Sequence, residues 1–122
     1  MATRFDETTF AEAVREALRA MRDRRRLKQS PLLQARFVAD GESESGRIDR
    51  LHALLTGEIA ALRGVSRGDR TFLAAQAVFL DGTLSQEGAA ARLGMADSTL
   101  RRHLNEAAQR IHSVLWERER LS

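Results

Sequence analysis

Polar side chains with the chemistry to read DNA follow a glycine in the C-terminal half of the chain. Residues 85–111 read SQEGAAARLGMADSTLRRHLNEAAQRI, and Gly94 divides them into two helical patterns. Arginine binds guanine edges and phosphates, asparagine binds adenine, and hydroxyls bind phosphates. The second pattern places such side chains on one face, namely Ser98, Arg101, Arg102, Asn105 and Gln109. The sequence therefore predicts a helix face that contacts double-stranded DNA.

Two helices joined by a tight turn would position these side chains. Ser85 is placed to cap the first helix, and Gly94 is the residue type that turns the chain after a helix through positive φ. Ala90 provides the small side chain that a close helix crossing needs, and the second helix is predicted to start near Asp97. Its buried stripe has helical spacing and comprises Leu100, Leu104, Ala107, Ile111 and Val114. This is a helix-turn-helix layout, whose second helix enters the major groove and whose first helix, through Ser85 and Gln86, holds a phosphate.

Residues 66–115 resemble the DNA-binding helix-turn-helix of sigma-factor region 4 and of LuxR-type response regulators. The likeness rests on three features. They are Gly94, the start of the second helix at Ser98, Thr99 and Leu100, and the residues that follow this start, Arg101, His103 and Leu104. It implies that four side chains approach the groove, namely Thr99, Arg101, Arg102 and Asn105. One position departs from these families, because Ala96 stands where they usually have a capping Ser or Thr. Asp97 is an alternative cap, but its carboxylate would weaken phosphate binding locally.

The chain before this motif predicts further helices. They cover residues 10–27, a short stretch that starts at Ser30–Pro31, residues 47–63 and residues 69–80. Thr9 with Glu12, and less closely Ser66 with Asp69, have the spacing of a capping box. The acidic residues 39–46 are predicted to form a loop. We therefore expect an all-α fold of five to six helices with a C-terminal helix-turn-helix and a long final helix.

The predicted domain organisation separates support from recognition. Residues 1–63 form an N-terminal helical region for support or dimerisation, and residues 64–122 form the DNA-binding region, both within one compact domain. The final helix exceeds what a groove contact needs. We expect its end, with Trp116, to pack on the first helix, on the third helix or on a second copy of the chain.

Composition excludes several classes of protein. The chain has 122 residues, 43% of them hydrophobic and 30% charged, which is typical of a folded domain. It has no cysteine, which excludes disulfides and thiolate metal sites. No apolar run approaches the roughly 20 residues that span a bilayer, and the first residues lack the apolar core of a secretory signal. We therefore expect a cytoplasmic protein that does not bind a membrane.

Signals for catalysis are weak. The histidines, His52, His103 and His112, lack the spacing that brings two metal ligands onto one helix face. The sequence has neither a glycine-rich phosphate loop nor a nucleophile in a strained turn. We expect no enzymatic activity, no cofactor and no metal. His103 is interpreted as a residue that faces or flanks DNA.

Two functions remain open. The first is a DNA-binding transcriptional regulator that acts as a homodimer or with a partner such as RNA polymerase. The second is a protein-interaction adaptor that keeps the helix-turn-helix shape. The recognition segment, residues 96–110, favours it, because three arginines against two acidic residues are few for a DNA contact. The basic run at residues 22–28 likewise has two interpretations, a phosphate-contacting arm or a solvated helix end.

Overall fold

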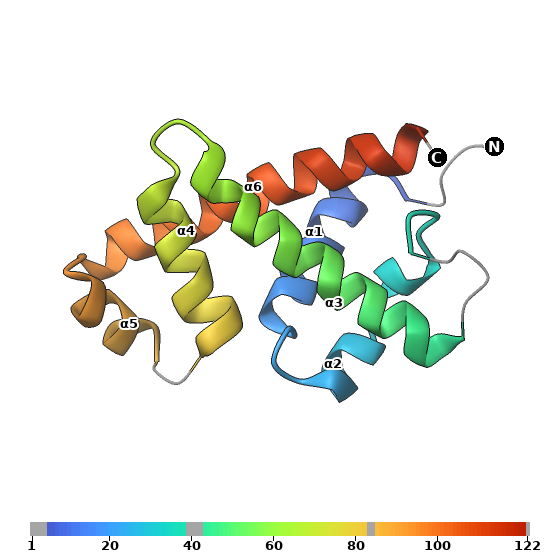
Figure 1. The fold of residues 1–122 in the computed structure, drawn as a ribbon, viewed down its shortest axis with the longest axis horizontal. Coiled ribbons are helices and arrows are strands. Elements are labelled where there is room, and N and C mark those ends of the chain that lie inside the picture. The colour runs from blue at the N-terminus through green and yellow to red at the C-terminus, as the bar shows by residue number, and fades with distance from the viewer. Residues whose placement is uncertain (1–4, 39–42, 83–84, 122) are drawn as a thin grey trace.

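The computed structural model describes residues 5–38, 43–82 and 85–121 and confirms the predicted all-α fold. Within these ranges the chain has six α-helices and no strand (Figure 1). The helices are α1 (Glu7–Arg19), α2 (Arg24–Lys28), α3 (Glu44–Ala61), α4 (Asp69–Ala75), α5 (Gln86–Leu93) and α6 (Asp97–Leu121). Three shorter turns connect them, the 3-10 turns η1 (Pro31–Gln34) and η2 (Leu62–Gly64) and the π-helical η3 (Gln76–Asp81).

The helix predicted for residues 10–27 is wrong at both ends, because α1 begins at Glu7 and ends at Arg19. Asp6, rather than Thr9, caps α1, and its carboxylate accepts a hydrogen bond from the Thr9 backbone N–H at 2.7 Å. This hydrogen bond holds the pKa of Asp6 below its ordinary value of 3.8. The chain leaves α1 after Arg19, and Asp23 caps the separate helix α2. A second capping residue within the basic run therefore starts a new helix.

Other predicted boundaries have mixed outcomes. Ser30 caps η1 as predicted, with its hydroxyl accepting from the Leu32 N–H. The predicted loop at residues 39–46 is wrong at its end, because Ser43 caps α3; residues 39–42 lie outside the described ranges. Ser66 does not cap α4, since Gly68 occupies the cap position without a side-chain hydrogen bond.

The core is centred on α6, which packs against α1, α3, α4 and α5. In Figure 1, α6 runs behind α3 from α4 and α5 toward the end of the molecule where both termini lie. The ring of Trp116 lies 5.1 Å from that of Phe10, which confirms that the end of α6 packs on the first helix. Contacts of α1 and α3 with α6 cross the predicted division at residues 63/64. The recognition and support regions therefore share one hydrophobic cluster.

The buried stripe predicted for the final helix is wrong at one position. Leu100, Leu104, Ala107 and Ile111 are buried, but Val114 is 49% exposed and Leu115 is buried in its place. Both positions fit helical spacing after Ile111. Leu115 belongs to the hydrophobic cluster that also contains the buried residues of α1, and Val114 does not.

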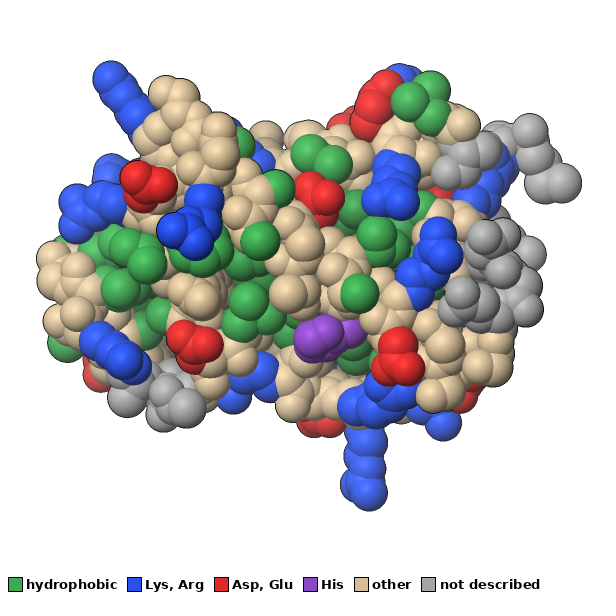
Figure 2. Space-filling model, in the orientation of Figure 1, with side chains coloured by type: hydrophobic (Ala, Val, Ile, Leu, Met, Phe, Trp, Pro, Cys, Tyr) green, Lys and Arg blue, Asp and Glu red, His purple; other side chains and the backbone are tan. Residues whose placement is uncertain are grey.

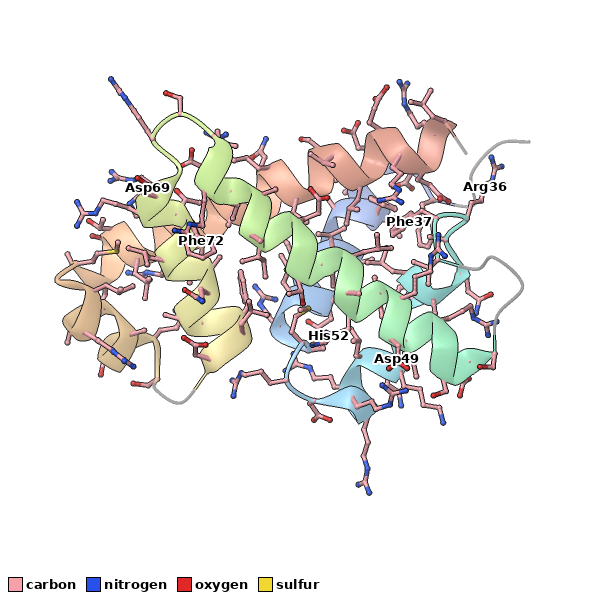
Figure 3. The ribbon with its side chains drawn as sticks, in the orientation of Figure 1. Arg36, Phe37, Asp49, His52, Asp69 and Phe72 are labelled. Carbon is pink, nitrogen blue, oxygen red and sulfur yellow. The ribbon has the colours of Figure 1, made fainter. Side chains whose placement is uncertain are left out.

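A buried carboxylate joins the end of α6 to the turn after η1. Glu119 is 1% exposed and accepts hydrogen bonds from the backbone N–H groups of Arg36 at 2.8 Å and Phe37 at 3.3 Å. Figure 3 labels Arg36 and Phe37 close to the C-terminal end of α6. Glu119 therefore satisfies two backbone donors that η1 leaves without a helical partner.

The surface is charged with limited apolar exposure. Figure 2 shows hydrophobic side chains at the surface over α4, where Leu73 is 44% exposed. None of the helices in the described ranges combines the length and the hydropathy that a membrane crossing requires.

Candidate nucleic-acid interface

The turn between α5 and α6 has the predicted geometry. The Ser85 hydroxyl caps α5 by accepting from the Gly88 N–H at 3.1 Å. Gly94 adopts the left-handed conformation with φ 68° and ψ 33°, which favours glycine. The Met95 N–H donates to the Ala90 carbonyl at 2.8 Å and closes the helix end, while the Ala90 side chain is buried. These contacts fix the angle at which α6 leaves α5.

The first half of α6 presents the predicted polar face to solvent. The exposed side chains are Ser98, Arg101, Arg102, Asn105 and Gln109. Thr99, which the resemblance places near the groove, is half-buried, while Leu100 and Leu104 are buried as predicted. Ala96 occupies the cap position, where its carbonyl accepts from the Leu100 N–H at 3.0 Å. Asp97 is the first helical residue, as predicted.

Helix α1 covers the same face farther along α6. Asn105, His112 and Trp116 lie on one side of α6 by their spacing, and α1 contacts all three. The Arg15 guanidinium donates to the Asn105 Oδ1 at 3.1 Å, which marks where the cover begins. About 12 Å of helix, from Asp97 to Asn105, precedes this cover, and we call it the free segment. A carbonyl oxygen accepts two hydrogen bonds, so Asn105 retains capacity for a base.

A basic groove lies between this end of α1 and the helix-turn-helix. Its volume is about 490 Å³. Five arginines line it, namely Arg15, Arg19, Arg22, Arg26 and Arg101, of which only Arg101 was predicted as a site residue. Three other predicted site residues line it as well, Ser85, Gln86 and Asn105, and its apolar lining is Val78, Phe79, Leu104 and Ala108. We call this feature the arginine groove. It brings Ser85, Gln86, Arg101 and Asn105 together, whereas Ser98, Arg102 and Gln109 lie outside it.

The structure separates the basic run at residues 22–28 into different roles. Arg24 pairs with Asp49, and Lys28 pairs with Glu44 at 3.4 Å, so both stabilise the packing of α2 near α3. Arg22 and Arg26 instead line the arginine groove. The run is therefore divided between two surfaces, and the phosphate-contacting interpretation stays a prediction for Arg22 and Arg26.

Sequence reasoning missed Arg15 and Arg19 as part of a site. The lining residues Arg15, Arg19, Arg22 and Arg26 are spaced by four, three and four positions. Within one continuous helix such spacing would place the side chains on one face, and this was the available signal, although the chain leaves α1 after Arg19. What the sequence did not contain was the partner surface, because Arg101 lies more than seventy residues away along the chain.

His103 faces α4 within the protein. Its Nδ1 lies 2.9 Å from the hydroxyl of Thr71, which is buried. The interpretation of His103 as a residue that faces DNA is therefore not supported by its contacts. Burial lowers the pKa of His103 below its ordinary value of 6.5, and the nearby Arg102 lowers it further.

This lowered pKa predicts a loss of stability on acidification. As the pH falls from about 7 to 5, the unfolded chain binds a proton at His103 before the folded chain does. The free energy of unfolding therefore decreases over that range, and the His103→Gln variant should decrease less. NMR titration of the His103 ring protons should give a midpoint below 6.5; a midpoint at or above this value would contradict the prediction.

Comparison with known proteins leaves the family of the chain open. No family model matches it, and no curated protein or solved structure matches it.

Proposed function

We propose that this protein binds double-stranded DNA through α5 and α6 and regulates transcription. The first half of α6 would lie in the major groove, where Arg101, Arg102 and Asn105 read base edges. Ser98 would contact the neighbouring backbone, and Ser85 and Gln86 a phosphate at the start of α5. Gln109 lies beyond the free segment, beside Ala61 and Val65, and is not part of the proposed contact. The cytoplasmic location belongs to this proposal.

The observation that carries the proposal is the exposed polar face at the start of α6. A helix with its side chains is about 10–12 Å across, which fits a major groove about 12 Å wide. Arg101, Arg102 and Asn105 all project from the free segment before α1 covers the helix. Arginine and asparagine make the bidentate base contacts that distinguish guanine and adenine.

The arginine groove weighs against the adaptor alternative. The recognition segment alone has few positive charges. The groove adds Arg15, Arg19 and Arg22 from outside that segment. The groove is thus lined by five arginines and, among the described residues, by no acidic side chain.

The partners follow from the size of the interface. One helix-turn-helix buries little surface, so useful affinity requires a homodimer on two half-sites about 34 Å apart, or a protein partner such as RNA polymerase. The resemblance to sigma-factor region 4 is compatible with either.

The proposal predicts that removing two arginines weakens DNA binding. The Arg101→Ala/Arg102→Ala variant should bind a duplex chosen by selection from random sequences about 30-fold more weakly than the wild type does. This follows from a loss of about 1 kcal/mol for each arginine. Fluorescence anisotropy of a labelled duplex over a range of salt concentrations measures the effect, and circular dichroism checks that helix content is unchanged.

The Arg25→Ala variant provides the control. Arg25 is exposed on α2 and lies outside the arginine groove. Its affinity should stay within about twofold of the wild type, since an isolated surface charge contributes little. Wild-type protein that binds no duplex even at low salt would contradict the proposal and favour the adaptor.

A further inference from the structure

The two walls of the arginine groove come from opposite halves of the sequence. Arg15, Arg19, Arg22 and Arg26 project from α1 and the segment that follows it. Ser85, Gln86, Arg101 and Asn105 form the other wall, at the beginning of α5 and on α6. Packing of α1 on α6 therefore creates a site that neither half contains alone.

The positive charge of the groove is only partly neutralised. Glu16 pairs with Arg26 at 2.6 Å and with Arg19 at 3.8 Å. Among the described residues, no ion pair is found for Arg22 or Arg101, and no acidic side chain lines the groove. Like charges that converge on one hollow repel each other, and an anion between them removes that repulsion.

The Arg22 side chain packs against the backbone of Gly82. Gly82 has a φ of 54°, and a Cβ built there would lie 1.8 Å from the Arg22 Nε. The guanidinium therefore lies directly over the backbone that leads into α5.

The donors in the groove match phosphate. A guanidinium presents parallel N–H groups that fit two phosphate oxygens. Helix α5 has eight residues, and its first turn adds backbone N–H groups and the positive end of the helix dipole. Ser85 and Gln86 stand at this turn, so both walls offer donors to the same anion.

We propose that the arginine groove binds phosphate groups, and that on DNA it holds the sugar-phosphate strand beside the bases that α6 reads. The location of the strand rests on the proposed function. Arg101 and Asn105 belong to both the groove and the reading face, so a strand in the groove lies next to the bases contacted by α6. Helix α1 thereby acts as a second, backbone-contacting element.

The first arm of the test uses pyrophosphate and no DNA. Thermal unfolding of the full chain is followed with and without pyrophosphate at constant ionic strength. Wild type and Arg25→Ala should unfold at a higher temperature with pyrophosphate, because a ligand that binds the folded state stabilises it. Arg19→Ala/Arg22→Ala should lose most of this shift, and Arg19→Lys/Arg22→Lys should recover part of it because the charges are restored.

The second arm uses the selected duplex and its dependence on salt. In Arg19→Ala/Arg22→Ala, the slope of log affinity against log salt should become shallower by about 1 to 2, which corresponds to the loss of one or two phosphate contacts. The loss of affinity should be similar for selected and random duplexes, since phosphates carry no base identity. Arg25→Ala should keep the wild-type slope.

The two arms separate this inference from the proposed function. Absence of DNA binding by the wild type would overturn the proposed function and the location of the strand, while a pyrophosphate shift that depends on Arg19 and Arg22 would still support the phosphate site. An unchanged salt slope in the double variant would overturn the location of the strand. A pyrophosphate shift that is absent, or equal in all variants, would overturn the phosphate site.

Discussion

Replacing Glu119 with alanine is expected to lower the free energy of unfolding by about 3 kcal/mol. The substitution removes the carboxylate oxygen that accepts hydrogen bonds from the backbone N–H groups of Arg36 at 2.8 Å and Phe37 at 3.3 Å. Water cannot easily replace this acceptor, because Glu119 is only 1% exposed. Each buried donor left without a partner costs about 1–3 kcal/mol, and truncation also leaves a cavity. Urea denaturation followed by circular dichroism measures the loss.

Glu117 offers a matched control on the same helix. Its side chain is exposed and pairs with Arg120 at 3.1 Å within one turn of α6. Glu117→Ala should therefore change stability by less than about 0.5 kcal/mol. Glu119→Gln keeps an acceptor oxygen and should fall between the two. Equal losses for Glu117→Ala and Glu119→Ala would show that Glu119 does not stabilise the turn.

Gly68→Ala is expected to destabilise the protein by about 3 kcal/mol. A Cβ at this position would lie 2.0 Å from the Leu62 carbonyl oxygen and 2.9 Å from that of Val65. Both are backbone atoms, so relief requires the connection from η2 to α4 to move rather than a side chain to rotate. Since α4 packs on α6, the displacement would reach the core beneath the polar face.

Replacing Gly57 with alanine should instead raise the free energy of unfolding. Gly57 is exposed within α3, and a Cβ there meets no atom within 4 Å. Alanine in a helix interior is favoured over glycine, so Gly57→Ala should stabilise the fold by about 0.5–1 kcal/mol. A loss in Gly68→Ala no larger than about 0.5 kcal/mol would contradict the assigned close approach.

Features governed by near neighbours in sequence were predictable. Ser85 and Gly94 act within a few residues of themselves, so their roles at the two ends of α5 followed from residue type and spacing. Position 9 shows the limit of such rules. The spacing of Thr9 and Glu12 indicated Thr9 as the cap of the first helix, but Asp6 caps it, and the helix begins between the packed rings of Phe5 and Phe10.

Features that depend on packing between distant segments were not predictable. Glu119 lies in a charged stretch, WERERLS, and its burial follows from acceptance of N–H groups more than eighty residues earlier. The arginine groove likewise depends on how α1 lies along α6, which residue spacing does not specify. Exposure of Arg101, Arg102 and Asn105 was predictable because helical periodicity alone separates them from Leu100 and Leu104.

The contact between Trp116 and Phe10 gives the molecule an intrinsic optical probe. Trp116 is the only tryptophan, and the chain has no tyrosine, so ultraviolet emission arises from this one indole. The ring is half-buried against Phe10, and undocking of α1 would expose it to water and shift its emission to longer wavelength. Asn105, the last residue of the free segment, lies about 16 Å from Trp116 along the helix axis, so the indole lies outside the proposed base contacts. A spectral change on adding DNA would therefore report movement of α1 rather than direct quenching.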